Sequence, residues 1–176
     1  MTAVIMGTGQ QAPAMVAGGK LAAAVIGRRS GFDKFNATID NLAFGAYNKP
    51  FEPKRTPFDW LSVNEENVDR YIADPLCGGG ATVGLFRDML GGIGFIGKAE
   101  NLKRMDLNTP VLFISGAMDP VGDLGKGVQK AYQSFVAAGV KDVTCKLYPG
   151  LRHEILNEKE RDRVYADIWT WLEKYL

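Results

Sequence analysis

The chain of 176 residues contains a single histidine, and an aspartate precedes it at a position that suits acid–base chemistry. His153 lies in the segment YPGLRHEILNE, just after the apolar run VTCKLY, and Asp119 lies in LFISGAMDP, at the end of another apolar run. A carboxylate that accepts a hydrogen bond from one imidazole nitrogen fixes the tautomer, so that the other nitrogen can take a proton from a nucleophile. The two residue types therefore predict an acid–base pair, which requires a fold that brings Asp119 and His153 together.

The segments before these two residues are expected to be neighbouring parallel strands. Residues 110–116 are continuously apolar, a pattern typical of a strand that is buried on both faces. Residues 125–139 carry an apolar helical stripe that stops at a glycine, and residues 142–148 form a second strand-like run. This β-α-β order predicts two parallel strands joined by a right-handed crossover. Ligand sites in such sheets lie at the carboxyl ends of the strands, where both candidate residues fall.

Other interpretations of the same residues remain open. Asp119 precedes Pro120 and also fits a turn or a helix cap, and a single histidine near a strand end also fits a structural role. The segment HEILN is similar to the zinc motif HExxH, but Asn157 replaces the second histidine, which argues against a zinc site. The glycine-rich GTGQQ at 7–11 matches neither GxGxxG nor a P-loop. We therefore expect no metal and no cofactor.

The remaining patterns divide the chain into a core and an insertion. TAVIM at the start is expected to be a short strand, residues 12–29 a helix, and residues 164–175 a C-terminal helix that packs on the sheet. The middle of the chain, from about residue 30 to residue 107, is rich in aromatic and turn residues. Its helical patterns include one or two short helices broken at Gly91-Gly92. We predict an α/β core made of residues 1–29 and 108–176, with a helical cap subdomain at residues 30–107.

Composition excludes several classes of partner. The formal net charge is +1, from 21 basic and 20 acidic residues, and no basic stripe suggests a nucleic-acid partner. The longest apolar stretch, residues 21–27, is too short for a transmembrane segment, and the N-terminus lacks a signal-peptide pattern. Cys77 and Cys145 form no CxxC motif and are expected to be free thiols. These features predict a cytoplasmic protein.

Several longer motifs resemble a known superfamily. LFISGAMDPVGDLGKGV followed by LYPGLRHEILNE is similar to the C-terminal half of the α/β-hydrolase serine hydrolases, in particular lysophospholipase and monoacylglycerol-lipase-like proteins of the serine aminopeptidase family. Segments 44–62 and 68–78 resemble the cap of that group. The resemblance implies the C-terminal portion of an α/β-hydrolase fold plus an inserted helical cap, with Asp119 as the acid and His153 as the general base. It also implies a nucleophilic serine in a GxSxG elbow before residue 1.

The chain itself contains no GxSxG motif. Its serines, none in a strand-turn-helix elbow, are Ser30, Ser62, Ser115 and Ser134. The resemblance implies hydrolysis of ester bonds in a small-molecule or lipid substrate, such as a monoacylglycerol or lysophospholipid, or of amide bonds, through an acyl-enzyme. Without the nucleophile and oxyanion donors, the isolated chain is expected to be inactive. Phe58, Trp60 and Tyr71 are expected either to line an acyl pocket or to pack the cap core.

Two non-catalytic hypotheses compete with this one. The TAVIM strand would expose an apolar edge, so the chain is alternatively an interaction module or half of a split protein, pairing through that edge with a missing half or a second copy. A flavodoxin-like receiver with Asp119 as phospho-acceptor is weaker, because it leaves the histidine segment unexplained and lacks an acidic cluster.

Overall fold

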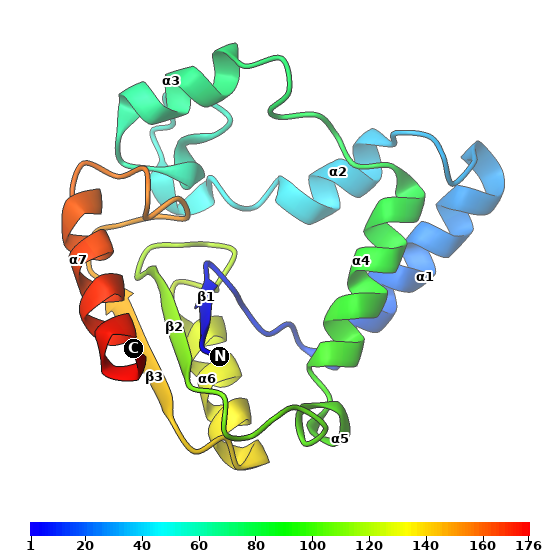
Figure 1. The fold of residues 1–176 in the computed structure, drawn as a ribbon. Helices are drawn as coiled ribbons and strands as arrows, with labels where there is room; N and C mark the ends of the chain where they lie inside the picture. Colours follow the sequence, from blue (N-terminus) through cyan, green and yellow to red (C-terminus); the bar gives the residue numbers. More distant parts are fainter.

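A three-stranded parallel sheet organises the computed structural model, which describes residues 1–176 (Figure 1). The strand order is β1-β2-β3, with bounds of Ala3–Met6 for β1, Val111–Gly116 for β2 and Val143–Tyr148 for β3. All six residues of the central β2 are buried, as its continuous apolar sequence predicts. The predicted β-α-β unit is confirmed: α6 (Lys126–Ala138) connects β2 with β3, and the two strands pair in parallel.

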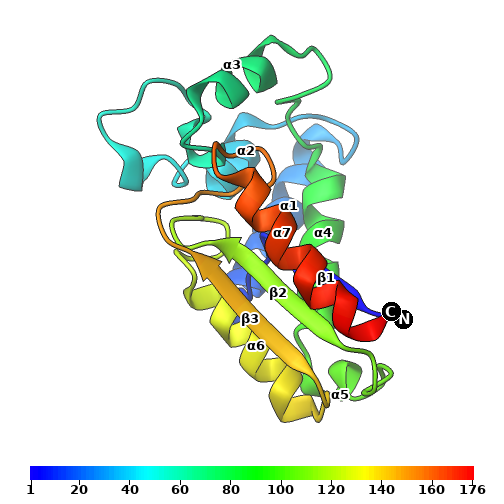
Figure 2. The same cartoon turned by 60° about the vertical axis from the view of Figure 1, so that its left-hand side comes forward.

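Helices cover both faces of the sheet (Figure 2). Alternate residues of β2 point to opposite faces, so Phe113 packs in a cluster with Val128 of α6, whereas Ile114 packs in a cluster with Trp171. Trp171 belongs to α7 (Arg161–Leu172), which continues into the short helix η3 (Glu173–Tyr175). The predicted C-terminal helix and its packing on the sheet are thus confirmed.

The regular elements between β1 and β2 are all helices, joined by loops. Its elements are α1 (Pro13–Ser30), α2 (Ala37–Phe44), η1 (Lys49–Phe51), η2 (Asp59–Leu61), α3 (Glu65–Ala73), α4 (Val83–Ile96) and α5 (Ala99–Leu102). The expected break at Gly91-Gly92 is wrong, because α4 runs through both glycines to Ile96. The packing of Phe86 and Leu90 against α1 offsets the cost of about 1 kcal/mol that each glycine brings to a helix interior.

Helix α1 packs with the middle of the chain. Val16 and Ala23 of α1 share one hydrophobic cluster with Ile39 of α2 and with Val83 and Phe86 of α4. Figure 1 shows α1 and α4 side by side, apart from the sheet. The predicted boundary between residues 29 and 30 assigns α1 to the core and α4 to the cap, although these two helices pack together. The division into core and cap stays a prediction.

Both cysteines of the chain, Cys77 and Cys145, are free thiols, as predicted. None of the helices combines the length and the apolar character that crossing a lipid bilayer requires.

Replacing Gly92 with alanine should stabilise the protein. A Cβ at Gly92 would meet nothing within 4 Å, so the change removes a flexible residue from a helix at no steric cost. We expect the free energy of unfolding to rise by about 1 kcal/mol, measured by urea denaturation followed by circular dichroism.

The matched control is Gly19→Ala in the partner helix α1. There a Cβ would lie 2.7 Å from Cδ1 of Leu90, so the same gain in helix propensity is opposed by crowding. Equal changes in the two variants would contradict the packing of α1 on α4.

Candidate active site

The ends of β2 and β3 bring Asp119 and His153 to the same edge of the sheet. Gly116 and Tyr148 are register partners at the strand ends, and Asp119 lies three residues beyond the first and His153 five beyond the second. The histidine loop then crosses directly over the end of β2, where a Cβ on Gly116 would overlap backbone carbonyl oxygens of the loop. The absence of a side chain at Gly116 thus permits the close approach of the two loops.

The structure brings the predicted pair into hydrogen-bond contact. Nδ1 of His153 lies 2.9 Å from Oδ2 of Asp119. Because an ionised carboxylate can only accept, Nδ1 is the donor, and the neutral ring then has a free lone pair on Nε2. The Asp119 side chain is completely buried, whereas the imidazole is 29% exposed. Nδ1 is therefore held by a buried partner, whereas Nε2 makes no hydrogen bond within the chain.

Further donors hold the Asp119 carboxylate. The hydroxyl of Ser115 donates to Oδ2 at 3.2 Å, and the backbone N–H of Val121 donates to Oδ1 at 2.9 Å. Ser115 is itself fully buried, which agrees with the sequence-based exclusion of this serine as a nucleophile. The hydrogen bond from Ser115 to Asp119 was not predicted, although the position of Ser115, four residues before Asp119 in the same segment, was a usable signal.

The imidazole is bounded by an aromatic residue and by the end of β1. The ring of Trp60 lies 5.3 Å from that of His153 between centroids, and the tilted ring of Tyr47 lies 5.1 Å from that of Trp60. Burial, and secondly the charge of Asp119, raise the pKa of Tyr47. Gly7 follows β1 with a φ of +58°, and a Cβ there would lie 3.1 Å from Cε1 of His153. All three strands therefore contribute to the surroundings of the imidazole.

The three predicted pocket-wall residues separate into two groups. Trp60 contacts the imidazole, whereas Phe58 and Tyr71 contact each other with tilted rings whose centroids are 5.1 Å apart. The hydroxyl of Tyr71 accepts a hydrogen bond from the backbone N–H of Gly78, which places this pair in a cluster of its own. Lining of a substrate pocket stays a prediction for all three.

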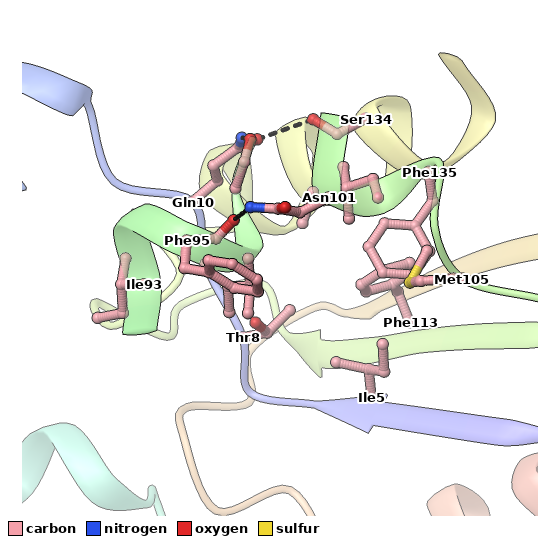
Figure 3. Close-up of a pocket in the computed structure, with 15 residues that line it drawn as sticks. Ile5, Thr8, Gln10, Ile93, Phe95, Asn101, Met105, Phe113, Ser134 and Phe135 are labelled. Atoms are coloured by element: carbon pink, nitrogen blue, oxygen red, sulfur yellow. Dashed lines mark hydrogen bonds between the residues drawn. The ribbon is translucent and has the colours of Figure 1, made fainter. Parts of the chain in front are cut away.

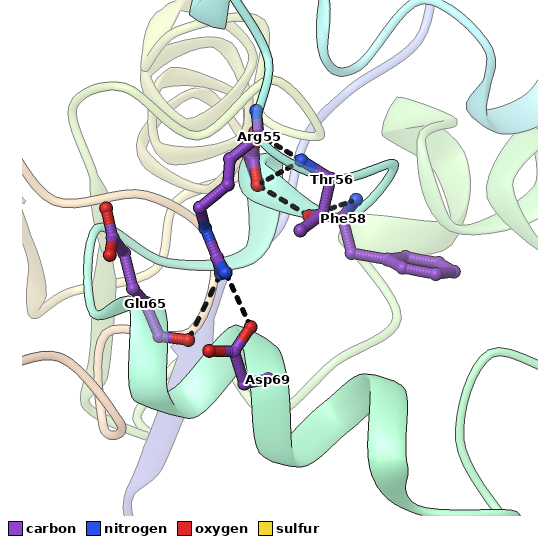
Figure 4. A network of polar contacts seen from close by, with 6 residues as sticks. Arg55, Thr56, Phe58, Glu65 and Asp69 are labelled. Carbon is purple, nitrogen blue, oxygen red and sulfur yellow. Dashed lines mark hydrogen bonds and ion pairs between the residues drawn. The ribbon is translucent and has the colours of Figure 1, made fainter.

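A polar network shapes the turn that carries Trp60 (Figure 4). The Asp59 carboxylate accepts hydrogen bonds from the backbone N–H groups of Arg55 and Thr56 and from the Thr56 hydroxyl. Burial raises the pKa of Asp59, but these hydrogen bonds outweigh it and lower that pKa below its usual value. The Arg55 guanidinium continues the network to Asp69 of α3 at 2.7 Å. These contacts fix the chain on both sides of η2 and so position Trp60.

A buried glutamate that sequence reasoning did not single out lies behind the histidine loop. Glu158 has no exposed side-chain surface and accepts hydrogen bonds from Ser62, Val63, Asn64 and Arg152. It ends the motif YPGLRHEILNE, so its position in that motif was the only available signal.

An apolar cavity of about 340 Å³ lies away from the imidazole, beside β1 (Figure 3). Its walls include Ile5 of β1, Phe113 of β2 and Phe135 of α6, with Phe95 and Met105 from the segment around α5. A hydrogen bond from the Ser134 hydroxyl to Oε1 of Gln10 lies at its rim. Neither Asp119 nor His153 lines this cavity. No three side chains of His, Cys, Asp or Glu come together as a metal site.

Comparisons with known proteins agree with this architecture. A family model described as serine aminopeptidase, S33 matches residues 2–160. The chain is 32% identical over 122 residues to a monoacylglycerol lipase from Mycolicibacterium smegmatis, a match that covers 67% of this chain and 40% of the lipase.

Solved structures share the fold. A carboxyl esterase from Bacillus coagulans matches with a TM-score of 0.84 at 24% identity, over 98% of this chain and 56% of the esterase. A monoacylglycerol lipase from Paleococcus ferrophilus matches with a TM-score of 0.62 at 23% identity, over 98% of this chain and 58% of the lipase. The chain thus spans about half the length of the relatives it matches.

Replacing Gly7 with alanine should displace the imidazole. The new methyl group would lie 3.1 to 3.2 Å from two ring atoms of His153, and the positive φ costs about 1–2 kcal/mol for a residue other than glycine. We expect a loss of stability together with a shift of the imidazole NMR signals, which are unambiguous because the chain has one histidine.

Gly150→Ala is the matched control. Gly150 also has a positive φ, of +78°, but a Cβ there would meet nothing within 4 Å. This variant should lose similar stability and leave the imidazole signals in place. Similar imidazole shifts in both variants would contradict the close contact between Gly7 and His153.

Proposed function

Because the chain belongs to the serine aminopeptidase S33 family of α/β hydrolases, we propose that Asp119 and His153 are the acid and the general base of a serine hydrolase. The resemblance inferred from the sequence is confirmed at this family level. The observation that carries the proposal is the 2.9 Å contact of Nδ1 with a buried carboxylate, which leaves Nε2 free. An imidazole held in this way is oriented to accept a proton through Nε2.

The proposed reaction is acyl transfer to a serine and then to water. Nε2 of His153 takes the proton of the serine hydroxyl as its oxygen attacks the ester carbonyl, and then gives that proton to the departing alkoxide. Water attacks the acyl-enzyme and gives a proton to Nε2. The bond between the acyl carbon and the serine oxygen then breaks, Nε2 returns the proton to that oxygen, and the carboxylic acid leaves. Asp119 keeps the ring in the required tautomer and stabilises the imidazolium in both halves of the cycle.

The proposed substrate class is a lipid-like ester, such as a monoacylglycerol or a lysophospholipid. Support comes from the lipase relative at 32% identity and from the aromatic residues of the helical segment, of which Trp60 reaches the imidazole. Amide hydrolysis is the alternative chemistry, since acyl transfer from an amide uses the same groups with an amine as the leaving group.

The proposal places the nucleophile outside residues 1–176. The sequence has no GxSxG motif, and the chain covers 56% of the esterase and 40% of the lipase that it resembles. In this fold the oxyanion donors are the backbone N–H after the nucleophile and another from an earlier loop. A chain without these parts lacks the nucleophile and most of the electrostatic stabilisation.

The second candidate is half of a split protein, or a module that pairs through β1. The strand β1 pairs only with β2, so its outer edge has free backbone donors and acceptors. The apolar cavity is lined by Ile5 of this strand (Figure 3). An added segment would satisfy the edge and fill the cavity. This candidate is compatible with the first, since the added segment is where a nucleophile would reside.

The purified chain should show no appreciable hydrolysis of p-nitrophenyl butyrate and no labelling by a fluorophosphonate probe. The reason is that none of its serines hydrogen-bonds to Nε2 of His153. Their hydroxyls donate to other groups: Ser30 to Ile26, Ser62 to Glu158, Ser115 to Asp119 and Ser134 to Gln10. Robust labelling of any serine in residues 1–176 would refute the assignment of the nucleophile to another segment.

The same assays applied to a longer chain, with an in-frame GxSxG segment encoded upstream, test the assigned roles. Asp119→Asn should lower kcat by about 10⁴-fold, because the carboxamide no longer enforces the tautomer. His153→Ala should lose activity to a similar or greater degree. Activity that survives both changes would contradict the proposed base and acid.

Edge pairing predicts that the isolated chain associates. We expect light scattering to report dimers or larger species as the concentration rises, because an unpaired β1 edge and an apolar cavity favour contact between copies. A folded monomer at high concentration would argue against pairing between copies of this chain.

A further inference from the structure

We propose that Glu158 is a positioning residue that ties the loop carrying His153 to the turn before α3, so that the orientation of the imidazole and the placement of the helical segment above it depend on each other. The inference deepens the proposed function, on which the catalytic meaning of His153 rests. It assigns a role to a residue that neither the motif chemistry nor the acid–base pair explains.

The hydrogen bonds of Glu158 join segments far apart in the sequence. Its Oε2 accepts from the Ser62 hydroxyl at 2.7 Å and from the backbone N–H of Asn64 at 3.2 Å, and both of its oxygens lie 3.1 Å from the backbone nitrogen of Val63. Its Oε1 also accepts from the backbone N–H of Arg152 at 3.1 Å. One carboxylate therefore holds the turn at 62–64 and the residue directly before His153.

The residue directly after His153 is held to the same region. The backbone N–H of Glu154 donates to the carbonyl of Leu61 at 2.7 Å, and the Glu154 carboxylate accepts from Nδ2 of Asn67 at 2.5 Å. Leu61 ends η2, which also contains Trp60, the residue whose ring lies against the imidazole. His153 thus lies between two backbone anchors that both lead to the segment 60–67.

Because Glu158 is fully buried, its hydrogen bonds to residues 62–64 cannot be lost without a large cost in stability. A carboxylate with no exposed surface is strongly destabilising unless several donors satisfy it, and three of its donors come from residues 62–64. Moving that turn away would leave the Glu158 carboxylate unsatisfied beside the loop. Asn64 adds to the tie, because its Nδ2 donates to the carbonyl of Asn157 at 3.1 Å and its side chain makes no capping hydrogen bond to α3.

The test uses the chain as it stands and observes its one imidazole by NMR. In the unaltered chain the neutral ring should show the Nδ1-protonated tautomer, as the hydrogen bond to Asp119 requires. In Glu158→Gln, an amide group replaces an oxygen that accepts backbone N–H groups, so the anchor at Arg152 and the turn at 62–64 both weaken. We expect loss of the single tautomer pattern of His153 and a coincident shift of the assigned Trp60 indole signal.

Glu160→Gln is the matched control. It changes a glutamate two residues after Glu158, but this carboxylate is exposed and pairs with Arg163 at 3.5 Å, not with the histidine loop or the turn at 62–64, so the tautomer pattern should persist. Ser62→Ala keeps Glu158 and removes one donor, and it should move the same signals in the same direction by less. This second variant keeps the test decisive if Glu158→Gln fails to fold.

An unchanged His153 tautomer pattern in both Glu158→Gln and Ser62→Ala, with only stability reduced, would overturn the positioning role and leave Glu158 as a fold-stabilising residue. Movement of the imidazole without movement of the Trp60 signal would overturn the coupling to the helical segment. Neither readout requires hydrolysis, so failure of this inference is distinguishable from failure of the proposed hydrolase function.

Discussion

The Asp119 carboxylate has no contact with solvent, and the arrangement around it follows from the need to satisfy it. A buried carboxylate without donors is strongly destabilising, so each of its hydrogen bonds constrains the residue that provides it. The hydroxyl of Ser115 and the backbone of Val121 come from the same loop and strand. The third donor comes from a different segment of the chain: Nδ1 of His153, in the loop after β3, donates to Oδ2 of Asp119. The tautomer of the imidazole is therefore a consequence of burying the acid.

A second buried carboxylate, that of Glu158, imposes the same requirement for donors on the loop that carries His153. Glu158 is also fully buried, and its donors come from the loop before His153 and from the turn that leads into α3. One buried carboxylate orients the ring, and the other holds the backbone that carries the ring. Because the second one draws its donors from the helical segment, the sheet edge and that segment are joined at the imidazole, where Trp60 completes the contact.

The parts of the fold that the sequence predicted are those set by local pattern. The apolar run of β2 and the helical stripe of α6 require no knowledge of distant residues, and together they placed Asp119 and His153 at one sheet edge. The continuation of α4 through Gly91-Gly92 could not be predicted in this way, because packing on α1 decides it. The role of Glu158 depends on residues more than 90 positions away, and its charge alone suggested a surface residue.

The end of β1 connects the acid–base pair with the unpaired edge of the sheet. Gly7 directly follows β1 and lies against Cε1 of His153, the ring carbon between the two nitrogens. A further parallel strand would lie about 4.8 Å beyond β1 and would end beside Gly7, at the same edge as the imidazole. A residue at the carboxyl end of that strand would then be a neighbour of His153, just as Asp119 is from the end of β2. The open edge of the sheet is thus on the side where Gly7 borders the imidazole, so the acid–base proposal and the edge-pairing proposal concern neighbouring parts of the molecule.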